Sequence, residues 1–145
     1  KTYDSLDPEG WYDTRVIEGV FQAIEKNSST ILAWAAMKVI GQNVYPTIEK
    51  TVGLPKTLKT PVDFVKFEAE GFLANHRGRD VIPRKFIKAE PGHVIVDAPS
   101  PGYNCAFIEG VFDGILQMCQ IKDGKVKQTK CLTKGDDTCQ FEIKW

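Results

Sequence analysis

The sequence predicts an α+β domain in which N-terminal helices pack on one face of an antiparallel sheet, in the order ααα(α)ββαββ. Residues 14–75 carry apolar side chains at helical spacing, together with several helix-start signals. Residues 84–98 and 125–144 are instead short extended runs broken by Gly, Pro and Asp. One apolar-striped helix separates these two pairs of strands, an arrangement typical of α+β domains. A length of 145 residues fits a single domain over 1–145.

Three helices are predicted before residue 53, over 14–26, from about 29 to 43, and over 46–52. Asp13 or Thr14 can cap the first, and Gly53 can end the third. Their apolar residues are predicted to be buried. In the first two helices these are Val16, Ile17, Val20, Phe21 and Ile24, then Ile31, Leu32, Trp34, Ala35 and Val39.

The fourth helix has the clearest start signal. Thr60 is a good N-cap, Pro61 suits the first helical position, and Asp63 favours the positive end of the helix dipole. This helix should run to about residue 75. A hairpin of strands 84–90 and 93–98 should follow, turning at Pro91-Gly92.

The C-terminal run from Cys105 to Trp145 holds all four cysteines. Apolar residues at 107, 108, 111, 112, 115 and 116 predict an amphipathic helix that Cys105 opens. Two extended runs, 125–133 and 138–144, then predict a hairpin centred on Gly135. In that register Cys131 and Cys139 lie opposite each other, about 4.5–5.5 Å apart at Cβ. Cys119 continues the apolar stripe of the helix and is predicted to be a buried structural thiol.

The composition does not favour several classes of binding partner. The formal net charge is zero, which does not favour nucleic acid or an anionic membrane surface. No apolar run is long enough to span a membrane. Four cysteines are too few for a disulfide scaffold, so we expect reduced thiols and a cytoplasmic protein.

The C-terminal motif resembles a known family. The segments Pro99-Ser100-Pro101-Gly102-Tyr103-Asn104-Cys105 and Cys131-Leu132-Thr133-Lys134-Gly135-Asp136-Asp137-Thr138-Cys139-Gln140-Phe141-Glu142-Ile143, with Gly110 in the helix, resemble the vinyl-4-reductase-type domain. That domain belongs to the fold group that also holds haem nitric-oxide sensor domains and small subunits of Golgi tethering complexes. The resemblance covers about residues 77–145. It implies the same α+β architecture.

The resemblance implies zinc as a cofactor. Some relatives bind zinc with three cysteines and a glutamate, and the spacing of Cys105, Cys131 and Cys139 fits that set. Gln128 stands where the glutamate is expected, and a neutral amide is a poor zinc ligand. Water, Glu142 or the Asp136-Asp137 loop are alternative fourth ligands. Three thiols that simply pack, or a Cys131–Cys139 disulfide, are alternatives to a metal site.

Haem is not expected. The haem nitric-oxide sensors carry a Tyr-x-Ser-x-Arg signature, and the most similar string here, residues 3–7, ends in Asp7 rather than arginine. His76 is predicted to be a polar cap at the end of the fourth helix, and His93 to face solvent.

An apolar or aromatic small molecule is the expected ligand, bound between the helices and the sheet. Aromatic residues exceed what a small core requires, although most such stripes are only core. The candidate ligand-binding residues are Trp34, Phe64, Phe67, Phe72, His76, Phe86 and Phe112.

We therefore predict a small-molecule-sensing regulatory domain without catalytic residues, acting on a fused output domain or as a homodimer. The chain has no Gly-x-Ser-x-Gly, phosphate-binding or dinucleotide motif. The family resemblance leaves two alternatives. One is an accessory reductase in bacteriochlorophyll (tetrapyrrole) synthesis, and the other is a tethering or assembly subunit that pairs through its helices.

Overall fold

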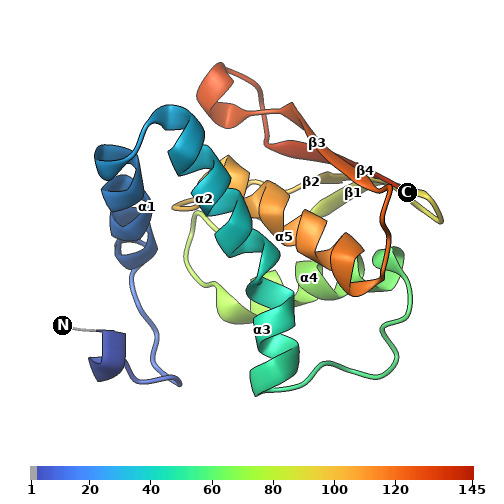
Figure 1. Cartoon of the computed structure of the whole chain (residues 1–145), viewed down its shortest axis with the longest axis horizontal. Coiled ribbons are helices and arrows are strands. Elements are labelled where there is room, and N and C mark those ends of the chain that lie inside the picture. Colours follow the sequence, from blue (N-terminus) through green and yellow to red (C-terminus); the bar gives the residue numbers. More distant parts are fainter. Residues whose placement is uncertain (1–2) are drawn as a thin grey trace.

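The computed structural model describes residues 3–145 and confirms the predicted fold class and element order (Figure 1). A 3-10 turn, η1 (Tyr3–Ser5), precedes the first helix, and a second, η2 (Leu132–Lys134), lies between the last two strands. The helices are α1 (Arg15–Asn27), α2 (Thr30–Gln42), α3 (Val44–Thr51), α4 (Pro61–Asn75) and α5 (Cys105–Met118); the strands are β1 (Lys85–Glu90), β2 (His93–Asp97), β3 (Lys125–Lys130) and β4 (Gln140–Lys144).

The four strands form one antiparallel sheet in the order β1-β2-β4-β3. Alternation along the two central strands turns Val94 and Val96 of β2, with Ile143 and Phe141 opposite them on β4, toward the helices. These side chains are fully buried against α5, where the ring centroids of Phe112 and Phe141 lie 5.5 Å apart. The space between α5 and the sheet is therefore filled core.

Glycines let α2 cross closely over α5. A Cβ atom at Gly110 would overlap the carbonyl oxygen of Lys38, and one at Gly114 would overlap that of Gln42. On the facing side, a Cβ atom at Gly41 would overlap the carbonyl of Phe107. The two backbones thus pack in direct contact, and any larger side chain at these three positions would force them apart.

This crossing decides which side of α2 is buried, and it corrects the prediction from sequence. The buried residues are Ala33, Met37 and Gly41, which face α5. The predicted set of Ile31, Leu32, Trp34, Ala35 and Val39 is exposed instead. Two residues of α1 predicted to be buried, Val16 and Val20, are also exposed, although Phe21 is in the core. The error in α2 arises because apolar residues surround this helix, so the spacing of apolar residues could not show which side is buried.

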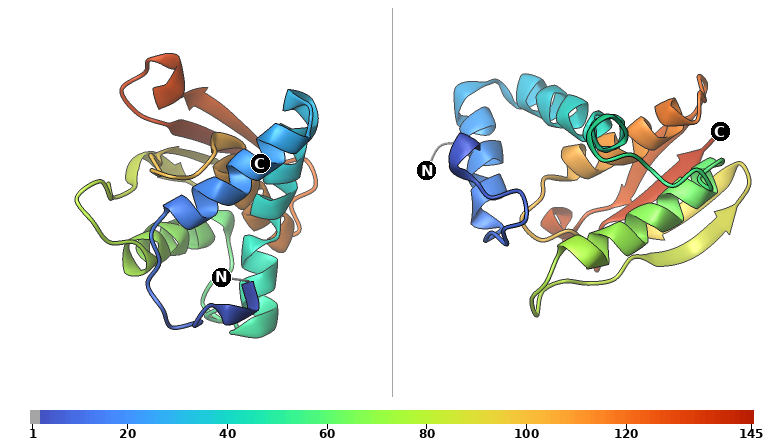
Figure 2. Two further views of the ribbon diagram at one scale, coloured as in Figure 1. Left: turned by 90° about the vertical axis from the view of Figure 1, so that its left-hand side faces the viewer. Right: turned by 90° about the horizontal axis from the view of Figure 1, so that it is seen from below.

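The start of α4 is as predicted. Thr60 and Asp63 form a reciprocal capping box, with Pro61 at the first turn. In the two views of Figure 2, α4 lies apart from α2, so that α5 is flanked by helices as well as by the sheet. In the part of the chain that the structure describes, no helix is long and apolar enough to cross a membrane.

Candidate functional site

A cavity of about 350 Å³ lies among helices α3, α4 and α5, rather than between the helices and the sheet as expected. Its wall is mostly apolar and comes from three helices and two loops. The lining residues are Val44, Tyr45, Ile48, Phe67, Glu68, Gly71, Phe72, Asn75, His76, Arg84, Tyr103, Phe107, Ile108 and Val111. We call this the inner cavity. Its size and its few polar groups in an apolar wall are typical of small-molecule sites.

A buried ion pair forms one polar part of the inner cavity. The guanidinium of Arg84 donates from Nη2 to Glu68 Oε1 at 2.8 Å and from Nε to Oε2 at 3.2 Å. Its Nη1 donates to the Pro99 carbonyl and to Ser100 Oγ, and its Cζ atom lies 3.7 Å from the centre of the Phe72 ring. The Arg84 side chain is 1% exposed and that of Glu68 is 9% exposed. The two charges neutralise each other, so the cavity offers directional polar groups without a net charge.

His76 and Tyr103 form the second polar part. His76 Nδ1 lies 2.8 Å from the Phe72 carbonyl, which can only accept, so Nδ1 carries a proton. Its Nε2 lies 2.9 Å from Tyr103 Oη, and in the neutral ring it accepts the Tyr103 hydroxyl proton. An imidazole held at Nδ1 by a carbonyl presents Nε2 in the manner of a metal-ligating histidine.

Tyr45 adds a hydroxyl that is not used within the fold. The side chain is buried beside Phe64 and Phe67, and burial raises the pKa of its phenol well above the usual range, with the charge of Glu68 adding to the shift. Among residues 3–145 its hydroxyl has no hydrogen-bond partner. A neutral phenol on the cavity wall is therefore available to a ligand.

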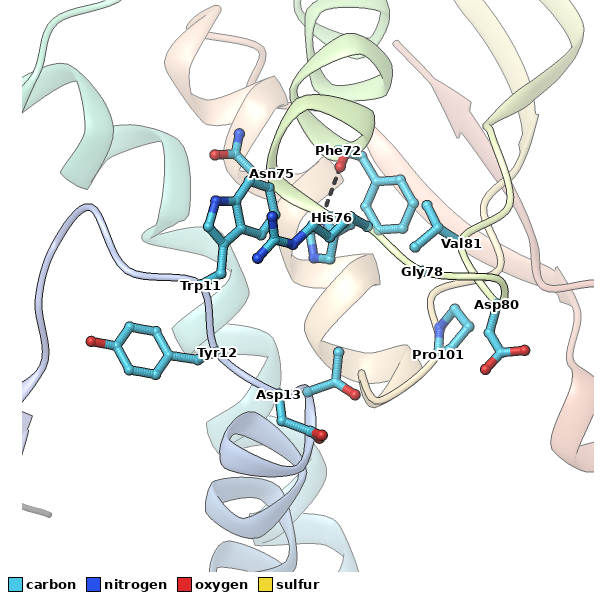
Figure 3. A pocket seen from close by; sticks show the side chains of 12 residues that line it. Trp11, Tyr12, Asp13, Phe72, Asn75, His76, Gly78, Asp80, Val81 and Pro101 are labelled. Atoms are coloured by element: carbon cyan, nitrogen blue, oxygen red, sulfur yellow. Dashed lines mark hydrogen bonds between the residues drawn. The ribbon is translucent and has the colours of Figure 1, made fainter.

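A second cavity, of about 400 Å³, lies on the outer side of His76 (Figure 3). The N-terminal segment with Trp11 and Tyr12 forms one wall, and the loop after α4 forms the other. The Arg77 guanidinium lies 4.1 Å from the centre of the Trp11 indole and fastens this segment to the body. Both cavities are lined by Phe72 and His76, so these side chains separate them. We call this the outer cavity; its wall is more polar, which makes the inner cavity the better site for an apolar ligand.

The three predicted cysteines converge. Cys105 Sγ lies 3.8 Å from Cys131 Sγ and 3.7 Å from Cys139 Sγ, and all three sulfur atoms lie within 4.8 Å of one another. Thiolates bound to tetrahedral zinc at about 2.3 Å are about 3.8 Å apart. The sulfur positions thus have the spacing of three corners of a zinc site. All four cysteines of the chain are free, and no Cys131–Cys139 disulfide is present.

The structure separates the alternatives for a fourth ligand. Glu142 is held by His93 and Lys144, and Asp137 by Lys130. Asp136 accepts from the Cys131 backbone amide at 2.7 Å and shapes the turn. Among these candidates, Gln128 is the side chain that acts on the Cys105 thiol, whose pKa it lowers, and its amide nitrogen donates to the Lys130 carbonyl at 3.0 Å. A zinc ion here would have three thiolates and either the Gln128 amide oxygen or water.

Burial raises the pKa of Cys105 to about 12, while the hydrogen bond from Gln128 opposes the shift. The pKa of Cys131 is lowered, chiefly by the Thr133 hydroxyl 3.0 Å from its sulfur. The pKa values of the two thiols are therefore shifted in opposite directions, and metal binding would have to displace the proton of Cys105.

The structure places three of the seven predicted ligand-binding residues, Phe67, Phe72 and His76, on the inner cavity. The others lie elsewhere. Phe64 is buried beside Tyr45, and Phe86 is half-buried on β1. Phe112 is on α5 but packs against Phe141 of the sheet, and Trp34 is an exposed residue of α2 beside Lys38. His76 does cap α4, and His93 is half-buried against Glu142 rather than free in solvent.

Sequence reasoning missed the polar residues of the inner cavity, namely Tyr45, Glu68, Arg84 and Tyr103. Glu68 stands within an apolar helix stripe, which is a signal that its carboxylate needs a buried partner. Nothing in the sequence pairs it with Arg84, which lies 16 residues further on in a loop.

No family model and no curated protein matches the sequence. Solved structures of H-NOX proteins do match the fold. A structure from work on haem distortion in the H-NOX family superimposes with a TM-score of 0.74 at 12% identity, covering 97% of this chain and 76% of that one. The A71G variant of an H-NOX protein from K. algicida, as unliganded Fe(II), gives 0.72 at 15% identity, with 99% and 80% coverage. An H-NOX protein from S. oneidensis in the Fe(II)NO state gives 0.67 at 14% identity, with 99% and 82% coverage.

At these identities the likeness shows the fold alone. It confirms the fold group to which the C-terminal motif pointed, whereas the vinyl-4-reductase assignment within that group stays a prediction. It also corrects one expectation. Haem was not expected from the sequence, but the structures that share this fold belong to proteins studied with haem or iron bound.

Proposed function

We propose that this chain is a small-molecule-sensing domain whose ligand binds in the inner cavity. The observation that carries the proposal is an apolar cavity lined by a buried ion pair, a histidine–tyrosine hydrogen bond and the free Tyr45 hydroxyl. A core that served only stability would gain from filling this space with hydrocarbon. The fold shared with H-NOX proteins adds support, since those proteins are haem-based.

The cavity chemistry favours a neutral, mainly apolar or aromatic ligand with one or two polar atoms. Phe67, Phe72 and Phe107 offer flat apolar surface, and Tyr45 can donate one hydrogen bond. An anion would have to compete with Glu68 for Arg84, and a cation would have to compete with Arg84 for Glu68. Each would leave a buried charge unpaired, which is expensive. A neutral ligand leaves the pair intact.

The sensing step we propose is a change in the segment that precedes α5. Pro99 and Ser100 accept from Arg84, and Tyr103 bonds His76. A ligand that contacts Tyr103 more favourably in one arrangement of this segment shifts the population toward that arrangement. An output domain or a second copy of the chain would then read the shift.

A zinc ion on Cys105, Cys131 and Cys139 completes the proposal. It would fasten the start of α5 to the hairpin of β3 and β4. The sulfur spacing supports it, and the proton of the Cys105 thiol would be released on binding. Elemental analysis of protein purified without chelator tests it, with one zinc per chain expected.

Filling the cavity tests the ligand site. Gly71 lies on α4 at the cavity wall, and a Cβ atom there would meet no other atom. Gly71→Leu should fold, since leucine is the better helix former by about 0.5–1 kcal/mol. It should weaken binding of neutral aromatic probes such as naphthalene and indole, measured by calorimetry, by at least about tenfold.

Gly19→Leu on the exposed side of α1 is the matched control, because a Cβ atom there also meets nothing. It should leave probe binding unchanged. Equal binding by wild type and Gly71→Leu, or no binding of any probe by wild type, would reject the inner cavity as the site.

Haem is a second candidate ligand, favoured by a specific observation. His76 is fixed through Nδ1 by a carbonyl and directs Nε2 to Tyr103, so opening one hydrogen bond would free a nitrogen that could hold the haem iron. Arg84 is the cation on the cavity wall and is already paired with Glu68. When bound, haem would supply a redox-active iron that takes diatomic ligands.

Titration with haemin, followed by its absorption spectrum, tests this candidate. A saturating 1:1 shift is expected, and His76→Ala should change the spectrum of the complex while Tyr103→Phe should strengthen binding by freeing Nε2. A titration without saturation, or a spectrum identical in wild type and His76→Ala, would refute His76 as the ligand.

A further inference from the structure

Arg77 places a positive charge on the wall of the outer cavity that no carboxylate of the fold neutralises. Its guanidinium lies 4.1 Å from the centre of the Trp11 indole, and within residues 3–145 it forms no ion pair. A contact with an aromatic ring uses the face of a guanidinium, whereas its N–H donors lie in the plane of the group and point outward. The Arg77 side chain is therefore held in place with its donors free.

The outer cavity also has two carboxylates on its wall, and each already has an arginine of its own. Asp13 accepts from Nε and Nη2 of Arg15 at 2.9 and 2.8 Å, and Asp80 lies 3.9 Å from Nε of Arg79. Neither of these arginines lines the cavity. The charge that remains uncompensated on this wall is that of Arg77, so the outer cavity favours an anion.

The inner cavity has the opposite preference. Its charged groups, Arg84 and Glu68, are buried and lie 2.8 Å apart in an ion pair. An anion beside them would leave one charge unpaired, so the inner cavity favours a neutral group. A ligand that suits both cavities is therefore neutral at one end and anionic at the other.

The inner and outer cavities share a wall made of side chains. Phe72, Asn75 and His76 line both of them, and Figure 3 shows all three at the wall of the outer cavity. The ring of His76 stacks on that of Phe72, with the centroids 4.2 Å apart, and its Nε2 is held by Tyr103. Arg77 is the next residue along the chain. A movement of the His76 ring would therefore join the two cavities near the free guanidinium.

We propose that the ligand of the inner cavity is an aromatic carboxylate, whose rings lie in the inner cavity and whose carboxylate binds Arg77 in the outer cavity. A short flexible chain connects the two parts past His76. The inference rests on the proposed function, because it takes the inner cavity as the ligand site. A carboxylate can form two parallel hydrogen bonds with a guanidinium and carries a single charge. A phosphate would bring a second charge, which Asp13 and Asp80 on the same wall would repel.

Calorimetry with matched naphthalene probes tests the proposal on the whole chain. The probes are naphthalene, 2-naphthoate, 4-(2-naphthyl)butanoate and the methyl ester of that butanoate. Wild type should bind the butanoate at least about fivefold more tightly than its ester, because only the acid can pair with Arg77. It should bind 2-naphthoate more weakly than naphthalene, because a carboxylate attached directly to the ring would stay in the inner cavity beside the buried ion pair.

Arg77→Gln should remove the preference for the acid over its ester and leave the affinity for naphthalene within about twofold of wild type. Arg79→Gln is the matched control. It removes the same charge from a side chain that is 93% exposed and outside the cavity lining, so it should keep the preference. A preference that survives Arg77→Gln, or that Arg79→Gln removes equally, would overturn the proposal.

Gly71→Leu distinguishes a ligand that occupies both cavities from one that uses the outer cavity alone. It should weaken the binding of naphthalene and of the butanoate alike, because the rings of both lie in the inner cavity. A butanoate that binds this variant as tightly as wild type would overturn the proposal. Naphthalene binding without any preference for the acid would also overturn it, but would leave the inner cavity as the ligand site, whereas no binding of any probe would reject both.

Discussion

Replacing Glu68 by glutamine should destabilise the fold by about 3 kcal/mol, because it leaves the Arg84 charge buried without a partner. The pair has two hydrogen bonds, of 2.8 and 3.2 Å, and Arg84 is 1% exposed. Breaking a buried pair from one side costs about 3–5 kcal/mol. We expect the lower end, since Arg84 keeps the Pro99 carbonyl, Ser100 Oγ and the face of Phe72.

The double variant Glu68→Leu with Arg84→Met separates what the ion pair contributes to stability from the cost of leaving one buried charge without a partner. Replacing both partners by apolar groups is often neutral or stabilising, so the double variant should lose less than about 1 kcal/mol. Arg84→Met alone should lose about 3 kcal/mol. Wild type, Glu68→Leu alone, Arg84→Met alone and the double variant form a thermodynamic cycle for two residues in direct contact, and Glu68→Gln is measured beside them.

Urea denaturation at pH 7, followed by circular dichroism, gives the free energies of unfolding. A loss of about 3 kcal/mol should also lower the melting temperature by about 6–12 °C for a domain of this size. Lys130→Gln, which removes an exposed ion pair with Asp137, serves as the control and should show no resolvable change. The reasoning is refuted if Glu68→Gln loses less than about 1 kcal/mol, or if the double variant loses as much as the two single variants together.

Three further predictions test the packing, the helix cap and the metal site. Gly110→Ala should destabilise the fold by about 1–3 kcal/mol, because its methyl group would overlap the α2 backbone. The control Gly19→Ala, whose methyl group meets no other atom, should be neutral or stabilising. Equal effects of the two substitutions in urea denaturation would contradict the close crossing of α2 and α5. The Thr60 hydroxyl and nearby amides hold the pKa of Asp63 below its usual value, so its carboxylate stabilises the fold above that usual value, and the contribution is lost as the pH falls through the lowered pKa. Acidification from about pH 6 to about pH 3 should therefore lower the melting temperature of wild type more than that of Asp63→Asn, and parallel curves would count against it. Cys139→Ser should lose the bound zinc by elemental analysis, and full occupancy in this variant would remove the three-thiolate site.

Local signals allowed most of the fold to be predicted. Capping residues placed α4, and the C-terminal register placed Cys131 and Cys139 close together, because the ladder pairs Lys130 with Gln140. Both signals act over a few residues. The exposed side of α2 could not be predicted, because all its faces are apolar and the choice depends on glycines of α5 that follow about 70 residues later.

The cysteine cluster could be predicted from the sequence, whereas the inner cavity could not. Cys105, Cys131 and Cys139 come from adjoining elements whose connection the sequence specifies, and the structure brings them together. The inner cavity depends on how α3 and α4 pack around α5, which no pattern in the sequence encodes. The aromatic residues were therefore recognised as a group, but Phe112 and Phe86 could not be told apart from Phe67 and Phe72.

The segment 98–105 connects the features on which the proposals depend. At one end, Pro99, Ser100 and Tyr103 are tied to cavity groups, and at the other Cys105 joins the sulfur cluster. Within the segment Gly102 has φ +86°, and a Cβ atom there would meet Thr14 just before α1. If zinc fixes the Cys105 end, a ligand that displaces Tyr103 acts on a segment that is held at both of its ends.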